Sequence, residues 1–175
     1  MEIFGAGNLT VIRREGMGFM GFVVMFAAAW LAVFVLYSMN KSLSVLENAF
    51  VFLIVLTLGI NISWIVAEEF KLIALTKNGL LYSGFIIFRS VVVPLLLVIA
   101  MNVIFKYKSA WGVVFAVAGT LAVFLALNGA ALFYKIHRYE RWNIGYDALV
   151  FLSLTAVVYA LLQLYRKVVY GRYPA

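Results

Sequence analysis

The sequence predicts an all-α fold, a polytopic bundle of about five transmembrane helices joined by short loops. Of the 175 residues, 66% are hydrophobic and 12% are charged, whereas soluble domains are roughly 45–50% apolar. The mean hydropathy is +1.07, and the charged residues stand in short clusters between long apolar runs. A water-soluble core and a disordered chain are both excluded, so we expect a single integral membrane domain over residues 1–175.

Five apolar runs are long enough to cross a bilayer. At 1.5 Å per residue each run matches a hydrocarbon core of about 30 Å, and since lipid offers no hydrogen bonds to the backbone, each is expected to be helical. The predicted spans are about Met17 to Tyr37, Ala49 to Ala67, Leu81 to Phe105, Trp111 to Tyr134 and Tyr146 to Tyr165.

The first run follows Arg13 and Arg14 and exceeds the roughly 7–15 apolar residues of a signal peptide, so we expect a retained helix. With an odd number of spans, one side would hold eight basic residues: Arg13, Arg14, Lys71, Lys77, Arg89, Lys135, Arg138 and Arg141. The other would hold six: Lys41, Lys106, Lys108, Arg166, Lys167 and Arg172. This bias favours a cytoplasmic N-terminus in a cell membrane.

The connections are short, and aromatic residues such as Tyr37, Trp111 and Tyr134 mark the span ends. The longest connections are about Glu68 to Gly79 and Lys135 to Gly145, which we expect to be loops. The formal net charge of +7 is spread over all of them. Lipid headgroups are therefore the expected counter-charge, and a nucleic-acid partner is not.

The third run contains Arg89 about eight residues inside an apolar segment, with Pro94 five residues later. An arginine at mid-bilayer costs roughly 2.5–3.5 kcal/mol and needs a partner or water. The alternative is an interfacial arginine that extends its head group to the membrane surface. Pro94 is expected to kink the helix.

The second run carries Thr57, Asn61, Trp64 and Glu68 at spacings of four, three and four, which places them on one helical face. This face either lines a solute path or forms interhelical hydrogen bonds. Glu68 or Glu69 would share a membrane side with Arg89, so an ion pair between them is a hypothesis. Thr57, Asn61, Glu68, Arg89 and Asn102 are accordingly the candidate polar site.

Other spans carry single carboxamides, namely Asn102, Asn128 and Gln163, which we interpret as hydrogen-bonding groups between helices. Small residues at a spacing of four form a ridge in the fourth span, which we expect to pack within the chain. The ridge consists of Ala118, Ala122, Ala126 and Ala130.

The segment 135–145, KIHRYERWNIG, contains His137, the only histidine. As an acid or base it would have Glu140 as a partner, but a histidine among basic residues is more typical of a solvated headgroup contact. Asn143 or Asp147 is the expected N-cap of the last helix. The sequence has no cysteine and no metalloprotease, nucleophile-elbow or phosphate-loop motif, so no catalytic residues, cofactor or metal are predicted.

The turn Tyr139-Glu140-Arg141-Trp142-Asn143, followed by a last helix ending in basic and aromatic residues, resembles a group of uncharacterised small multi-pass membrane proteins of spore-forming Gram-positive bacteria. The resemblance covers 106–167. It implies a membrane setting in a bacterium and carries no established activity.

Three functions are compatible with these features. The favoured one is a structural or accessory membrane protein that acts through helix contacts with itself or another membrane protein. A small-solute transporter or channel-like subunit is the alternative, based on the Thr57 to Glu68 face and on Arg89. A membrane enzyme would need Glu68, Glu69, Arg89 or His137 gathered at one membrane face.

Overall fold

The computed structural model describes the backbone of residues 3–107 and 109–171 and the side chains of 18–107 and 109–169. Within these ranges five helices are long and apolar enough to cross a membrane, which confirms the predicted helical bundle. Arg13 and Arg14 have side chains outside the described residues. The spans run over Gly18–Ser38, Val45–Glu69, Gly79–Lys106, Ala110–Phe133 and Ile144–Val169.

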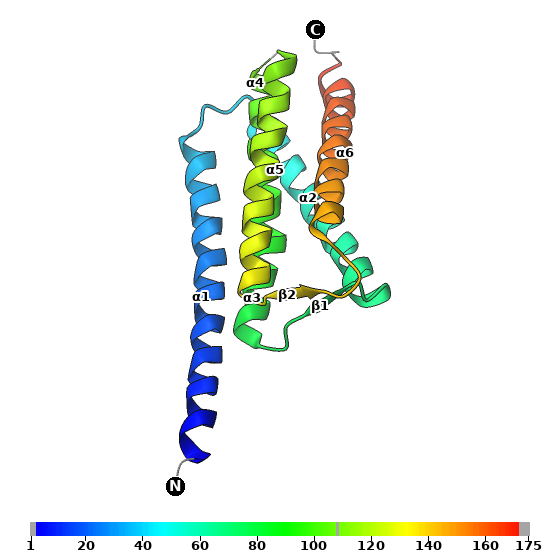
Figure 1. Ribbon diagram of the computed structural model, residues 1–175. Coiled ribbons are helices and arrows are strands. Elements are labelled where there is room, and N and C mark those ends of the chain that lie inside the picture. The colour runs from blue at the N-terminus through cyan, green and yellow to red at the C-terminus, as the bar shows by residue number, and fades with distance from the viewer. Residues whose placement is uncertain (1–2, 108, 172–175) are drawn as a thin grey trace.

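The elements follow one another along the chain as an up-and-down bundle (Figure 1). The first half contains α1 (Ile3–Ser38), α2 (Val45–Trp64), the π-helical turn η1 (Ile65–Glu69) and strand β1 (Ile73–Leu75). The third span is α3 (Gly79–Ile87), the π-helical turn η2 (Phe88–Val92) and α4 (Val93–Lys106). The second half consists of α5 (Ala110–Phe133), strand β2 (His137–Tyr139) and α6 (Ile144–Tyr170). The two chain ends lie at opposite ends of the bundle.

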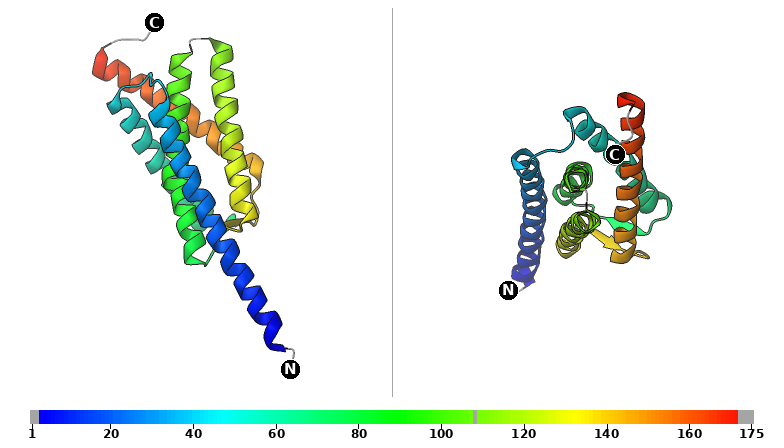
Figure 2. Two further views of the ribbon diagram at one scale, coloured as in Figure 1. Left: turned by 90° about the vertical axis from the view of Figure 1, so that its left-hand side faces the viewer. Right: turned by 90° about the horizontal axis from the view of Figure 1, so that it is seen from above.

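The third span is the centre of the molecule. Viewed along the bundle, the green helix α3–α4 lies between α1, α2, α5 and α6 (Figure 2). In its most apolar stretch 61% of the residues are buried, against 11–28% in the other four spans. This span therefore supplies the middle of the core, and the other four contact lipid with most of their surface.

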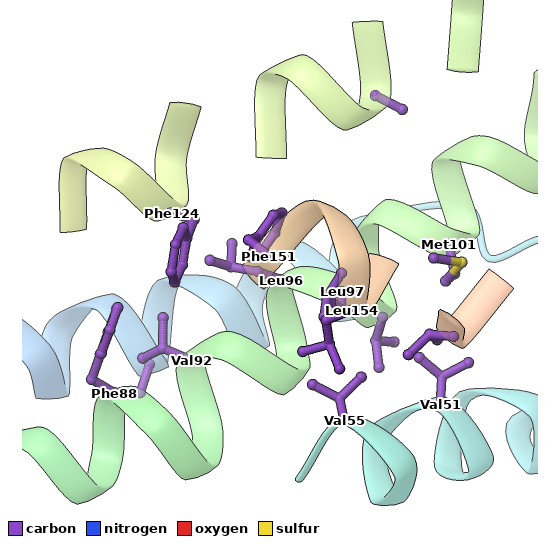
Figure 3. Packing of buried hydrophobic residues seen from close by; sticks show 14 of the residues in the cluster. Val51, Val55, Phe88, Val92, Leu96, Leu97, Met101, Phe124, Phe151 and Leu154 are labelled. Atoms are coloured by element: carbon purple, nitrogen blue, oxygen red, sulfur yellow. The ribbon is translucent and has the colours of Figure 1, made fainter. Parts of the chain in front are cut away.

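Apolar side chains fill the space around α4 (Figure 3). Val51 and Val55 of α2 pack toward Leu97 and Met101 of α4, and all four are completely buried. Further along, Phe124 of α5 stacks on the ring of Phe151 of α6 at 4.5 Å between centroids. Figure 3 shows these rings beside Phe88 and Val92 of η2. Burial of apolar surface against neighbouring helices thus fixes the positions of the spans.

Polar side chains fix the helix starts. Ser44 and Glu47 form a capping box at the start of α2, and Asn78 and Asn143 cap α3 and α6. Asn143 is therefore the cap that the sequence left open between Asn143 and Asp147, which frees the Asp147 carboxylate for other contacts.

A buried ion pair joins α2 to α6 at the end of the bundle away from the sheet. Arg166 Nε lies 2.6 Å from Glu47 Oε1, and the two side chains are only 17% and 6% exposed. The Arg166 guanidinium also lies over the ring of Phe105, at 4.2 Å from its centroid. Both charges are thus satisfied inside the protein.

The two longest connections, expected to be loops, pair with each other. β1 and β2 form an antiparallel ladder in which Ile73 faces Tyr139 and Leu75 faces His137. Figure 1 shows this small sheet at the lower end of the bundle. Three-residue strands are too short to show a periodicity, and each depends on a partner some sixty residues away, so neither strand could be predicted from its own segment.

The small-residue ridge of α5 does not pack within the chain as expected. Ala118, Ala122 and Ala126 are exposed, and only Ala130 is half-buried. The core side of α5 is formed instead by Ala116, Phe124, Asn128 and Ala131. Turning this face inward buries the large apolar surface of Phe124, which the alanine ridge cannot match.

Candidate functional site

A cleft of about 120 Å³ opens beneath the two-stranded sheet, between α2, the third span, α5 and α6. Most of its lining is apolar, including Ile62, Phe85, Phe88, Phe151 and Leu154. The polar side chains on its wall come from five different elements and from one connection. They are Ser63, Arg89, Asn128, His137, Trp142 and Asp147.

Arg89 reaches this cleft from the π-helical turn η2. It lies about 15 Å along the helix that begins at Gly79, at 1.5 Å per residue. The Nε atom is buried without a hydrogen-bond partner, and the guanidinium carbon lies 5.3 Å from the ring centroid of Phe85. An aromatic face stabilises a cation only weakly, so the charge of Arg89 is left without an anion among the described side chains.

His137 lies near the same Phe85 ring. Its ring and that of Phe85 are 6.3 Å apart in an edge-on arrangement, and its residue is only 5% exposed. Nδ1 is buried and has no partner. Burial lowers the pKa of His137, with the nearby charge of Asp147 acting in the opposite direction, so the imidazole is neutral at pH 7.

The expectation that His137 is a solvated headgroup contact was wrong. Because β2 pairs with β1, the side chain is turned under the sheet and into the protein. The neighbouring residues follow the expectation better: Arg138 is exposed and forms an ion pair with Glu140 at the surface. Strand alternation therefore separates one buried histidine from its charged neighbours.

Asp147 is the best-satisfied group in the cleft. Its carboxylate accepts hydrogen bonds from Asn128 Nδ2 at 2.6 Å, from Trp142 Nε1 at 2.7 Å and from the Tyr139 hydroxyl. Asn128 also donates to the Tyr139 oxygen at 2.8 Å. Burial, the hydrogen bond to Asp147 and its charge raise the pKa of Tyr139. These bonds tie α5, β2 and the start of α6 together and leave the carboxylate little capacity for another cation.

The cleft therefore has surplus donors. Asp147 has three donors, whereas the Arg89 cation and the Nδ1 atom of His137 have no polar partner among the described residues. A buried polar atom without a partner costs about 1–3 kcal/mol. Nε of Arg89 and Nδ1 of His137 are two such atoms, and the Arg89 cation in particular favours an additional group that bears acceptor atoms.

The predicted polar site is not one constellation. Thr57, Asn61 and Glu68 are exposed on the outer face of α2 and η1, and Asn61 donates only to the Thr57 carbonyl of its own helix, at 2.8 Å. Arg89 lies in the cleft, at the other side of α2. The hypothesised ion pair is absent, because Arg89 contacts neither Glu68 nor Glu69 among the ion pairs of the described residues.

Asn102 lies near the far end of the third span and is completely buried. Its Oδ1 accepts from the backbone amides of Ser42 and Leu43 at 3.0 and 3.1 Å, and its Nδ2 donates to Asn48 Oδ1 at 2.6 Å. It thereby holds the α1–α2 connection against α4. This is an interhelical contact, distant in sequence and in space from the cleft.

Four residues of the cleft cluster were not predicted as site residues, namely Asp147, Trp142, Tyr139 and Asn128. The sequence analysis interpreted Asp147 as a possible helix cap and Asn128 as a hydrogen-bonding group between helices. The signal available was a cluster of one acid with two aromatic donors near a span start, which has the ordinary composition of a membrane interface. Within the described residues no three His, Asp or Glu side chains gather as metal ligands.

Comparison with protein-family models, with curated proteins and with solved structures finds no match to this chain. The resemblance of 106–167 to small membrane proteins of spore-forming bacteria stays a prediction. Function must therefore be argued from the cleft itself.

Proposed function

We propose that this multi-pass membrane protein binds the anionic head group of an amphiphile in the cleft beneath the sheet. The observation that carries the proposal is that the Arg89 guanidinium and the Nδ1 atom of His137 lack polar partners in a cleft whose lining is otherwise mostly apolar. A phosphate or carboxylate oxygen would supply the acceptor that the Arg89 guanidinium lacks.

The charge argument favours an anion over a neutral group. A guanidinium is always protonated and presents its N–H donors in a fork that matches the oxygens of a carboxylate or phosphate. His137 is neutral at pH 7, so it adds one donor and one acceptor without adding charge. An anion with a remaining hydroxyl or amine could use both atoms.

The size and lining favour an amphiphile over a free anion. The cleft volume of about 120 Å³ is well below the 300–1,000 Å³ of pockets that enclose a complete drug-sized ligand. Only a polar end fits, and any attached hydrocarbon chain must lie outside. Half-buried apolar side chains at the cleft, Ile62 of α2 and Val66 of η1, offer that chain a surface.

The tightly packed core beneath the cleft favours a binding site that is closed at its inner end. It argues against a path for a solute through the membrane. Phe124 and Phe151 stack at its inner end, and the completely buried Val51, Val55, Leu97 and Met101 lie farther along α2 and α4. An accessory role through helix contacts is the second candidate, because Thr57 and Asn61 face out of the bundle.

Thermal stabilisation by short-chain lipids tests the proposal. The purified chain in a neutral detergent is titrated with dihexanoyl phosphatidic acid, with dihexanoyl phosphatidylcholine and with inorganic phosphate. A ligand at 100 times its Kd stabilises the folded state by about 2.7 kcal/mol. We expect phosphatidic acid to raise Tm, and phosphatidylcholine and inorganic phosphate to raise it much less.

Two arginine variants locate the effect. Arg89→Met is expected to abolish the shift, whereas Arg138→Met removes an equal charge at the same membrane end, outside the cleft, and is expected to retain it. Equal shifts in the two variants would contradict the proposal, as would a response to phosphatidylcholine as large as that to phosphatidic acid. A full response to inorganic phosphate would retain the anion site but reject the amphiphile.

A further inference from the structure

The outer face of α2 carries polar side chains where the chain offers them nothing to bind. Thr57, Asn61 and Glu68 are exposed, and Trp64 between them is 54% exposed. On the inner side of the same helix, Val51 and Val55 are completely buried. The face from Thr57 to Glu68, called here the α2 outer stripe, therefore has no neighbour within the described part of the chain.

Two members of the α2 outer stripe lie deep in the bilayer. The span ends at Glu69, so Asn61 and Thr57 are about 12 and 18 Å inside it at 1.5 Å per residue. Asn61 uses one N–H on the Thr57 carbonyl, and its Oδ1 has no partner among the described residues. Hydrocarbon chains cannot supply one, so an exposed carboxamide at this depth favours a protein neighbour.

We propose that the neighbour is a second copy of this chain, docked through the α2 outer stripe about a two-fold axis along the membrane normal. Copies inserted in the same orientation present equal residues at equal depth, so Asn61 meets Asn61. A carboxamide is both donor and acceptor and therefore pairs with itself, as a two-fold interface requires.

The charges at the end of the α2 outer stripe suit the same arrangement. Glu68 and Glu69 are followed by Lys71, and all three are exposed. Two parallel copies thus bring acids and bases of one short segment to the same membrane surface, where Lys71 of each copy is available to one carboxylate of the other. The large exposed ring of Trp64 adds apolar contact area next to Asn61.

Disulfide formation in membranes tests the interface, because the natural chain contains no cysteine. Thr57→Cys is expected to cross-link to a dimer upon oxidation, and the combination with Asn61→Gln is expected to do the same. The combination with Asn61→Leu is expected to lose most of the product. Val157→Cys, which is 46% exposed on α6, serves as the matched lipid-facing control, and Ala122→Cys reports on the ridge of α5.

The association constant gives a second measurement. In liposomes of increasing dilution, followed by energy transfer between labelled copies, Asn61→Leu is expected to raise the dimer Kd about 3- to 30-fold, the range for interhelical hydrogen bonds in membranes. Because Asn61 is exposed, the Tm of the Asn61→Leu variant in detergent should equal that of the natural chain. A wild-type chain that stays monomeric, cross-linking that is indifferent to Asn61→Leu, or cross-linking at Ala122 in place of Thr57 would overturn the inference.

Discussion

Arg89 and Asp147 carry opposite charges on the wall of one cleft, but they differ in how many hydrogen-bonding partners they have. Asp147 accepts from Asn128, Trp142 and Tyr139, which satisfies most of its capacity. Arg89 has only the Phe85 ring beside its guanidinium. Arg89 is half-buried and its Nε is enclosed without a partner, so a bound anion would relieve the cost of leaving this cation unpaired.

The buried His137 is expected to make the folding stability of the protein depend on pH. Its pKa is lowered because it is buried, so the folded state binds fewer protons than the unfolded state between the ordinary value of about 6.5 and the lowered one. Its contribution is complete above pH 6.5 and is lost as pH falls toward the folded value. Thermal unfolding in detergent should therefore show a lower Tm at pH 5.5 than at pH 7.5.

The control for this prediction is His137→Gln, which keeps hydrogen-bonding capacity and cannot titrate. The variant should show a smaller change in Tm over the same pH interval. Carboxylates titrate mainly below this window, and the sequence contains no other histidine. An equal pH dependence in both chains would assign the effect elsewhere.

Among single residues, the sequence indicated Arg89 and Asn102 because a charge or carboxamide in an apolar run is conspicuous. It did not indicate Asp147, Trp142 or Tyr139, which lie at a span end where such residues are common. Their convergence depends on the sheet, and the sheet depends on pairing between distant segments. Burial of His137 was missed for the same reason.

Among the elements, the third span combines a central position with an irregular backbone. The sequence predicted a kink at Pro94. The structure has the π-helical turn Phe88–Val92 just before Val93 and Pro94, where the amide of Val93 donates to the carbonyl of Phe88. Proline cannot donate to the carbonyl four residues earlier, so a change of hydrogen-bond pattern nearby is expected. Arg89 lies within this turn, and such turns are frequent at functional sites.

The Glu47–Arg166 pair predicts strong coupling between α2 and α6. Arg166→Met leaves the Glu47 carboxylate buried without its cation, which should cost about 3–5 kcal/mol of stability. The double variant Glu47→Gln, Arg166→Met removes both charges and should be more stable than Arg166→Met alone. Chemical denaturation in mixed micelles measures the four corners of this cycle.

Arg138→Met provides the comparison for that cycle, since its pair with Glu140 is at the surface, with side chains 78% and 43% exposed. Its loss should be below about 1 kcal/mol. If Arg166→Met is equally mild, or if the two changes at Glu47 and Arg166 are additive, the ion pair does not hold the two helices together.

For the whole molecule, the sequence was sufficient for the five spans and insufficient for the cleft. Long apolar runs are governed by the bilayer thickness, which acts on each run separately. The cleft is formed by five elements. Its lining therefore depends on which side of each helix faces α4. The outward ridge of Ala118, Ala122 and Ala126 illustrates the difficulty, because in lipid either face of an apolar helix can be buried.

We propose that the sheet end of the bundle faces the cytoplasm, on the basis of eight basic residues against six. A membrane-impermeant thiol reagent tests this with two exposed positions at opposite ends. Ser109→Cys should be labelled in intact cells, and Lys77→Cys only after permeabilisation. The reverse pattern would invert the topology and place the cleft at the outer surface.

Identifying the lipid that the cleft retains tests the anionic site at Arg89. The chain is reconstituted in nanodiscs of equal parts phosphatidylglycerol and phosphatidylcholine and released for native mass spectrometry. We expect preferential retention of phosphatidylglycerol by the natural chain and by Arg138→Met, and loss of that preference in Arg89→Met. Equal retention of the two lipids by the natural chain, or a preference that survives Arg89→Met, would contradict an anionic head group bound at Arg89.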